Sequence, residues 1–259
     1  GGFSAVNGIS RRALARLNAN GSLDTTFTPN IGGLSTSKIV VQPDGKIIVG
    51  GGFTTVNGSP IANVVRLNQD GSVDTSFNIG GGANNSVTAI LVLPDSKIYL
   101  GGTFSSFNGI SRRSLVRLEA NGTVDEAFAP NLSSGVNAIV RLPNKKIVVG
   151  GAVTANADAS PRQKILRLLE DGSVDFSFDV SGATYNSSSG TVWHLGIQPD
   201  GEILAAGQFD GISGVARSGL ARLLVNTNPT PAIFDFDGDG RTDISVFRPS
   251  SGIWYRINS

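Results

Sequence analysis

The sequence contains no cysteine, which excludes disulfides, thiolate nucleophiles and cysteine-ligated zinc. No apolar run approaches the roughly 18 to 20 residues that cross a bilayer, so no membrane span is expected. Charge of one sign is also lacking, because 21 Lys and Arg balance 20 Asp and Glu. The formal net charge of +1 offers a polyanion no basic field, and nucleic acid is not expected as a partner.

Glycine, by contrast, is abundant. The 34 glycines and the low charged fraction of 16 % favour many tight turns over long charged helices. A hydrophobic fraction of 39 % over 259 residues is sufficient to build a core. The chain starts at Gly1 without a methionine or a signal peptide, which indicates a processed or truncated N-terminus.

A repeat with a period of 50 residues runs through most of the chain. Glycine pairs begin at Gly1, Gly51 and Gly101, a Gly-Ala pair begins at Gly151, and a weaker fifth copy starts near Gly207. Every copy contains an Arg-Leu pair, and the first four also contain an Asp three residues before a Phe. The Arg-Leu pairs are Arg16-Leu17, Arg66-Leu67, Arg117-Leu118, Arg167-Leu168 and Arg222-Leu223.

Each copy predicts four short antiparallel strands. Residues 39–42 and 46–49 are rich in β-branched side chains and flank Pro43-Asp44-Gly45, which is a hairpin signal. Residues 13–18 and 22–27 flank a second turn that ends in Gly21, which suits a three-residue loop. That loop sets a register in which Arg16 faces Asp24. We therefore interpret the recurring Arg and Asp as structural ion pairs and not as acid/base machinery.

The predicted fold class is all-β: a β-propeller-like array of four-stranded antiparallel blades, with about four to five repeats of roughly 50 residues. Helical solenoids are excluded because no segment keeps an apolar period of 3.6 residues. A β-solenoid is the alternative, although its coils are usually shorter.

The repeat pattern GGFxxxNGxxRxxLxRLNxDGSxDxxF, followed by VxxIxxQPDGKIxVGG, resembles the bacterial delta-60 repeat over residues 1–225. This resemblance implies secreted or cell-surface bacterial proteins that fold as β-propellers and have no established activity. The fourth copy departs from the pattern at residues 152–162, and the fifth copy stops after Leu223.

Strand counting predicts an unpaired edge. The hairpin around the Pro-Asp-Gly-type turn occurs four times, near residues 38–49, 88–100, 137–149 and 192–206. The strand that contains the Arg-Leu pair occurs five times. Closing a ring would leave one Arg-Leu strand over. Because unpaired strand edges invite strand exchange, we expect a homo-oligomer or filament that associates through its edge strands.

The composition changes after a linker at residues 226–231, rich in Asn, Thr and Pro, and residues 232–259 form a separate predicted domain. Carboxylates there occupy loop positions 1, 3, 5 and 9, an alternation that can wrap Ca²⁺, with a backbone carbonyl at position 7. The predicted ligands are Asp235, Asp237, Asp239, Asp243 and, through its carbonyl, Arg241. Strands are expected at residues 244–247 and 253–257, whereas an EF-hand would need helices on both sides.

This C-terminal segment resembles the FG-GAP or VCBS repeat, in which such a loop within a blade holds calcium. The resemblance assigns the same five residues as the ligands of a single copy. An acidic, solvated turn without an ion is the alternative interpretation.

Three classes of function follow. The first is a non-catalytic extracellular structural or adhesive protein, stabilised by Ca²⁺ at its C-terminal loop. The second is a propeller that binds a surface carbohydrate, peptide or protein, and the third is a polysaccharide-degrading enzyme. The sole histidine, His194, lies in a predicted inner strand without a triad-like context, and we expect it to be a packed strand residue.

Overall fold

The computed structural model describes residues 1–155, 163–178, 180, 182–186, 188–225, 244–248 and 253–257. The chain divides into two compact units, Gly1–Leu223 and Leu224–Ser259. In the described part all regular structure is β, and no helix there is long and apolar enough to cross a membrane. The all-β fold class is confirmed.

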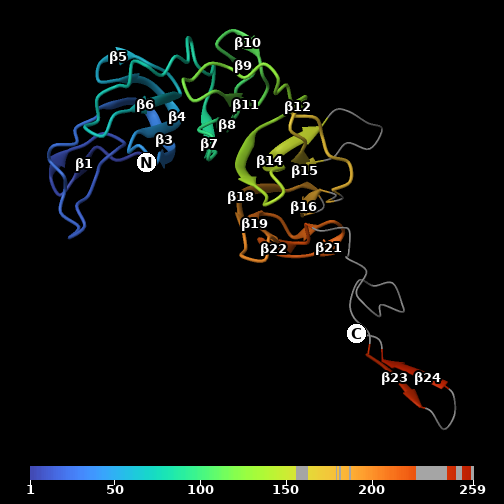
Figure 1. Ribbon diagram of the computed structural model, residues 1–259. Coiled ribbons are helices and arrows are strands. Elements are labelled where there is room, and N and C mark those ends of the chain that lie inside the picture. The colour runs from blue at the N-terminus through green and yellow to red at the C-terminus, as the bar shows by residue number, and fades with distance from the viewer. Residues whose placement is uncertain are drawn as a thin grey trace. The chain divides into compact units, whose positions relative to one another are not determined.

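Four antiparallel sheets make up most of the first unit, and we call them blades 1 to 4 (Figure 1). In each blade a middle strand lies between an inner strand, which precedes it in sequence, and an outer strand, which follows it. Blade 1 consists of inner β3 (Ile31–Val41), middle β4 (Ile47–Val56) and outer β6 (Val64–Leu67), with β5 (Ser59–Pro60) beside β4. Blade 2 consists of β7 (Val87–Val92), β8 (Ile98–Gly102) and β11 (Leu115–Leu118). Blade 3 consists of β13 (Val136–Arg141), β14 (Ile147–Ala155) and β15 (Gln163–Leu168), with β12 (Leu132–Ser133) beside β14. Blade 4 consists of β18 (Thr191–Ile197), β19 (Ile203–Gln208) and β22 (Leu220–Leu223).

The predicted fourth strand is short. In blades 1 to 3 it pairs with the outer strand through one bridge each, Leu67↔Val73, Leu118↔Val124 and Leu168↔Val174. In blade 1 the strand ends after Val73 because the next residue, Asp74, begins a turn. Its Oδ1 accepts a hydrogen bond from the Ser76 amide at 3.0 Å, which directs the backbone away from the sheet. Residues 1–27 form the same outer part of a blade, with the bridge Leu17↔Leu23, and we call them the N-terminal half-blade.

Two adjacent glycines explain how the blades are built and stacked. Each inner strand carries a β-bulge, which in blade 2 lies between Val87 and Ala89. A Cβ on Gly102 would lie 2.1 Å from the Ser86 carbonyl oxygen, so this position must be glycine. A Cβ on the preceding Gly101 would lie 2.7 Å from Val136 Cγ1 of blade 3. The missing side chain of Gly101 therefore allows the neighbouring blade to pack closely. The missing side chain of Gly102 leaves space for the β-bulge of its own blade.

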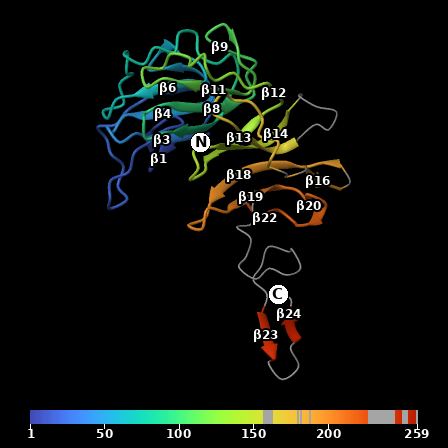
Figure 2. The same ribbon diagram turned by 45° about the vertical axis from the view of Figure 1, so that its right-hand side comes forward.

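The core lies between blades and not within one. Inner strands of successive blades contact one another, β3 with β7, β7 with β13 and β13 with β18 (Figures 1 and 2). Separate apolar clusters fill the interfaces between the half-blade and blade 1, between blades 1 and 2, and between blades 2 and 3. Face-to-face packing of separate antiparallel sheets is propeller architecture and not that of a solenoid.

Additional short strand pairs accompany the blades. They are β1 (Ala5–Val6) with β2 (Ile9–Ser10), β9 (Ser106–Phe107) with β10 (Ile110–Ser111), and β16 (Ala183–Tyr185) with β17 (Ser188–Ser189) and β20 (Gly211–Ile212), which also pairs with β21 (Val215–Ala216). In the second unit β23 (Ile244–Arg248) pairs with β24 (Ile253–Ile257), at the positions where strands were predicted.

Candidate functional site

The predicted calcium ligands Asp235, Asp237, Asp239, Arg241 and Asp243 lie outside the described residues, as does the predicted linker at residues 226–231. The strand pair that follows them, β23 and β24, is in place. Among the described residues, no group of three or more His, Cys, Asp or Glu side chains could hold a metal ion.

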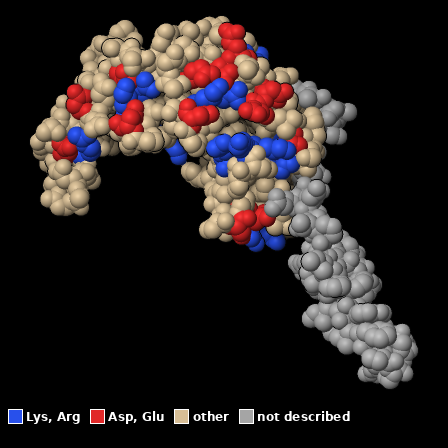
Figure 3. Space-filling view, in the orientation of Figure 1, with Lys and Arg blue, Asp and Glu red and all other residues tan. Residues whose placement is uncertain are grey.

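The predicted Arg-Asp pairs are confirmed and belong to a larger cluster. In blade 1, Asp74 Oδ2 accepts hydrogen bonds from Arg66 Nε at 2.7 Å and from Lys46 Nζ at 2.8 Å. Blades 2 and 3 repeat this arrangement of one carboxylate and two cations, and we call each set of three a triad. The triad of blade 2 is Lys97, Arg117 and Asp125, and that of blade 3 is Lys146, Arg167 and Asp175. Figure 3 shows Lys and Arg lying beside Asp and Glu across one face of the molecule.

The triads hold their carboxylates ionised. Burial raises the pKa of Asp74, but hydrogen bonds from Lys46, Ser76 and Arg66 outweigh it and hold this pKa well below its ordinary value. The arginine also stacks on an aromatic ring, with Arg66 Cζ 4.3 Å from the centre of the Phe77 ring. The same stacking recurs at Phe27, Phe128 and Phe178, which accounts for the constant spacing of Asp and Phe within the repeat.

The arginines of blades 1 and 2 also link their own blade to the next repeat. Arg66 Nη1 donates to the Ala120 carbonyl oxygen at 2.7 Å, and Arg117 Nη1 donates to the Glu170 carbonyl oxygen at 2.8 Å. A guanidinium with donors committed to a carboxylate and a backbone carbonyl is a structural tie. The recurring charged residues thus position blades.

The histidine is placed differently from expectation. His194 does lie in the inner strand β18, opposite Ala206, but it is exposed and not packed. The bulge before it leaves Trp193 about half-exposed, at 49 %. Blade 4 has no following blade among the described residues, which explains why these side chains reach solvent.

Both ends of the series of blades are incomplete. The N-terminal half-blade has the outer strand and its bridge, but within the described chain it lacks the inner and middle strands that blades 1 to 3 contain. Blade 4 has the inner, middle and outer strands, and no fourth strand pairs with β22 in the described part. In Figure 1 the inner strands at the two ends, β3 and β18, lie apart. The surplus outer strand predicted from the sequence is therefore the one at Leu17, and among the described residues no strand pairs with the free sheet edge at either end.

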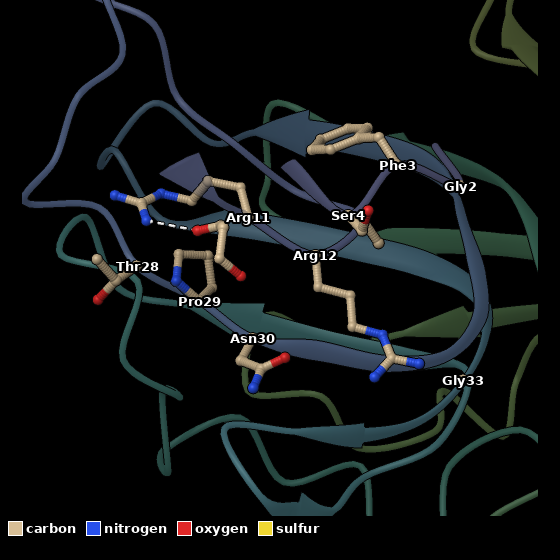
Figure 4. Close-up of a pocket in the computed structure, with 11 residues that line it drawn as sticks. Gly2, Phe3, Ser4, Arg11, Arg12, Thr28, Pro29, Asn30 and Gly33 are labelled. Atoms are coloured by element: carbon tan, nitrogen blue, oxygen red, sulfur yellow. Dashed lines mark hydrogen bonds between the residues drawn. The ribbon is translucent and has the colours of Figure 1, made fainter. Parts of the chain in front are cut away.

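A pocket of about 650 Å³ opens in the half-blade (Figure 4). Arg11 and Arg12 line it together with Phe3 and several small or polar residues, and no acidic side chain contributes. Arg11 Nη1 donates to the Ser10 carbonyl oxygen at 2.8 Å, which holds the guanidinium at the wall. Arg12 is exposed, and no hydrogen bond or ion pair of its side chain is recorded within the described part of the chain. The pocket is thus polar and positively charged.

Sequence reasoning missed two of these features. The lysines of the triads follow the first turn of each repeat at a constant position, so their spacing from Asp74, Asp125 and Asp175 was a usable signal. The pocket lined by Arg11 and Arg12 had no such signal, because its walls come from three separate stretches of the chain, within residues 2–4, 10–13 and 28–33.

Comparisons with known proteins bear on this architecture. The sequence matches the family described as "Domain of unknown function (DUF5122) beta-propeller" over residues 1–27, 42–77, 93–128, 142–178 and 198–226, which is more than half of the chain. The comparison with curated proteins found no match.

A solved propeller shows the same fold. The WD40 beta-propeller domain of Doa1 aligns with a TM-score of 0.53 at 17 % identity, covering 80 % of this chain and 56 % of that one. A protein of unknown function from Bacteroides caccae aligns with a TM-score of 0.42 at 12 % identity, over 75 % of this chain and 58 % of that one. A streptogramin B lyase aligns with a TM-score of 0.44 at 14 % identity, over 91 % and 75 %. The chain thus spans little more than half the length of the Doa1 domain and of the Bacteroides protein.

Proposed function

The chain belongs to the DUF5122 β-propeller family, and we propose that it acts without catalysis, as a rigid extracellular scaffold of the delta-60 type that associates through the open ends of its blades. The observation that carries this proposal is the pair of incomplete blades. An exposed sheet edge presents unpaired N–H and C=O groups that can add a strand from another molecule.

Exposed apolar side chains at the ends support association. Leu17 of the half-blade is 55 % exposed, whereas the equivalent Leu67 is fully buried in blade 1. On blade 4, Leu220 is 58 % exposed, whereas the equivalent Val64 is fully buried. Burying such side chains contributes about 25 cal/mol per Å² of apolar surface, so each end gains stability when covered.

Light scattering over a wide concentration range tests the proposal. The expected result is a mass above that of one chain that rises with concentration and decreases in Leu17→Lys, because lysine on an edge opposes strand addition. Leu169→Lys is the matched control, since Leu169 is 38 % exposed and lies in the turn after β15 of blade 3, a blade whose inner strand contacts those of both neighbouring blades. A monomer at every concentration would contradict self-association.

A second function is favoured by the pocket at Arg11 and Arg12. A polar, cationic pocket of about 650 Å³ suits an acidic carbohydrate or the carboxylate of a peptide. Screening on a glycan array tests this function, with Arg12→Ala expected to reduce binding. Arg113→Ala, which changes the equivalent arginine of a later repeat, is the control. Equal binding by both variants would reject the pocket as the ligand site.

We also propose that the C-terminal loop binds Ca²⁺, on the basis of its carboxylate spacing and its resemblance to the FG-GAP or VCBS repeat. Hard oxygen ligands at alternating positions are the donor set that Ca²⁺ prefers. Adding Ca²⁺ to metal-free protein should raise the melting temperature, and Asp237→Ala should abolish the gain. Identical behaviour of the two proteins would overturn the calcium site.

A further inference from the structure

A second pocket, of about 450 Å³, opens between blades 2 and 3. Both blades contain an inner, a middle and an outer strand, and the inner strand of each contacts those of the blades on either side. Blade 2 contributes Tyr99 to the pocket, and the hairpin between β13 and β14 contributes Arg141, Asn144 and Lys145. Cations of the two adjoining triads also line it. On the face that Figure 3 shows, Lys and Arg gather in one large patch.

The hairpin of blade 3 departs from the repeat at three positions that line this pocket. It carries Arg141, Asn144 and Lys145 where the other three hairpins carry an aliphatic residue, an aspartate and a glycine or serine. Those residues are Val41, Asp44 and Gly45 in blade 1, Val92, Asp95 and Ser96 in blade 2, and Ile197, Asp200 and Gly201 in blade 4. One acidic group is thus lost and two basic groups are gained at a single pocket.

The turn itself does not require these changes. Asn144 Oδ1 accepts a hydrogen bond from the Lys146 amide at 3.2 Å, and an aspartate accepts the same bond in the other hairpins, so only the charge differs. Lys145 has a φ of 70°, a left-handed conformation that Gly45 and Gly201 adopt without a steric penalty. Backbone strain that brings no structural gain is typical of a functional site.

The two added cations are available to a ligand. No hydrogen bond or ion pair of the Arg141 or Lys145 side chain is recorded in the described chain, whereas the other cations of the pocket belong to triads. Two acids, Asp95 and Glu170, also line the pocket, but neither is recorded in an ion pair with Arg141 or Lys145 within that part of the chain. These carboxylates would repel a polyanion, so the pocket suits a small anion.

Blade 2 adds a buried hydroxyl group. Tyr99 stands where the other middle strands carry Ile48, Val148 and Leu204, and it is only 3 % exposed. Its oxygen accepts a hydrogen bond from Arg117 Nη1 at 3.2 Å, but no acceptor for its own O–H is recorded among the described residues. Because a phenol can donate as well as accept, this O–H can donate to an oxygen atom of a ligand.

We propose that the pocket between blades 2 and 3 binds the carboxylate group of a small organic acid. Arg141 and Lys145 neutralise the carboxylate through charge-assisted hydrogen bonds, and the Tyr99 hydroxyl donates to an oxygen of the same ligand. Leu93 and Ile147 line the same pocket and offer apolar contact to a carbon skeleton, which inorganic anions lack. The site is separate from the pocket of the half-blade and from the proposed self-association.

Isothermal titration calorimetry on the full chain tests this site, with citrate, glucuronate and digalacturonate as probes. At least one of the three should bind with saturation, and inorganic sulfate should bind at least about ten times more weakly. Changing the hairpin to the residues of blade 1, with Arg141→Val, Asn144→Asp and Lys145→Gly, should weaken binding by about a hundredfold, roughly tenfold for each lost cation. Lys145→Gly alone should weaken binding by about tenfold without lowering the melting temperature, because it also removes the left-handed lysine.

The matched control is the double variant Lys38→Gln and Arg113→Gln, which removes two exposed cations outside this pocket. It should bind the acids like the unchanged protein. Tyr99→Phe keeps the ring that packs on Phe128 and should weaken binding several-fold. Binding that survives the triple change in the hairpin would place the ligand elsewhere and overturn the site. Equal affinity for sulfate, or no saturable binding of any of the three acids, would overturn the assignment of an organic acid.

Discussion

The N-terminal half-blade and blade 1 contain the same residue types in the same register, but they differ in what surrounds them. In blade 1 the Arg66 side chain is 7 % exposed and shares Asp74 with Lys46, whereas Arg16 is 38 % exposed and is the one cation recorded on Asp24 in the described chain. The local hairpin is thus the same in both, although the half-blade packs against a neighbouring blade on one side only within the described chain. Its burial, and with it the strength of its ion pair, comes from strands elsewhere in the array.

The largest expected effect comes from removing a triad carboxylate. Asp125→Ala leaves Arg117 without its carboxylate partner and Lys97 with only Glu119, so it should reduce the free energy of unfolding by about 3–5 kcal/mol. Asp24→Ala should cost clearly less, because water already reaches that pair. Urea unfolding measures both, and Asp125→Asn serves as the isosteric control. Equal losses at the two positions would refute the contrast between them.

A smaller effect is expected at the glycine that admits the next blade. Gly101→Ala should cost about 1–3 kcal/mol, because its Cβ would lie 2.7 Å from Val136 Cγ1. Blade 4 has Ala206 at this position and no blade beyond it in the described chain. Ala206→Gly should therefore relieve no clash and should cost only the strand penalty of glycine, about 0.5–1 kcal/mol. Thermal unfolding of both variants checks this, and full tolerance of Gly101→Ala would contradict the packing argument.

The smallest effect is a dependence of stability on pH. Hydrogen bonds from Thr26, and then from Arg16, lower the pKa of Asp24 from its ordinary 3.8 to about 2. Because the folded pKa is lowered, the stabilisation is complete above pH 3.8 and is lost as the pH falls toward 2. The pKa of Asp74 is lowered further, so the stabilisation that ionised Asp74 contributes is lost only at still lower pH. The free energy of unfolding should be measured between pH 2 and 7 for the unchanged protein and for Asp24→Asn. In Asp24→Asn it should depend less on pH between pH 2 and 3.8, and an unchanged pH dependence would contradict the lowered pKa of Asp24.

The strand pairing within each repeat could be predicted because it is local. A three-residue loop fixes its own register, and Arg16 does face Asp24 as expected. The lysine of the triad could not be derived in that way, because Lys46 precedes β4 while Asp74 follows β6, and their contact requires that these strands be neighbours. Likewise, the sequence shows alanine at position 206 where other repeats have glycine. Only the packed blades show that this glycine is needed for close packing of the following blade.

The hydrogen bonds from Arg66 and Arg117 to carbonyl oxygens of the following repeat affect how the protein unfolds. Releasing one blade breaks a hydrogen bond of its neighbour as well, as between Arg66 and Ala120. Linked modules of this kind melt from their termini inward, because a central module is held on two sides and a terminal one on a single side. We therefore expect the half-blade and blade 4 to fray before the blades between them.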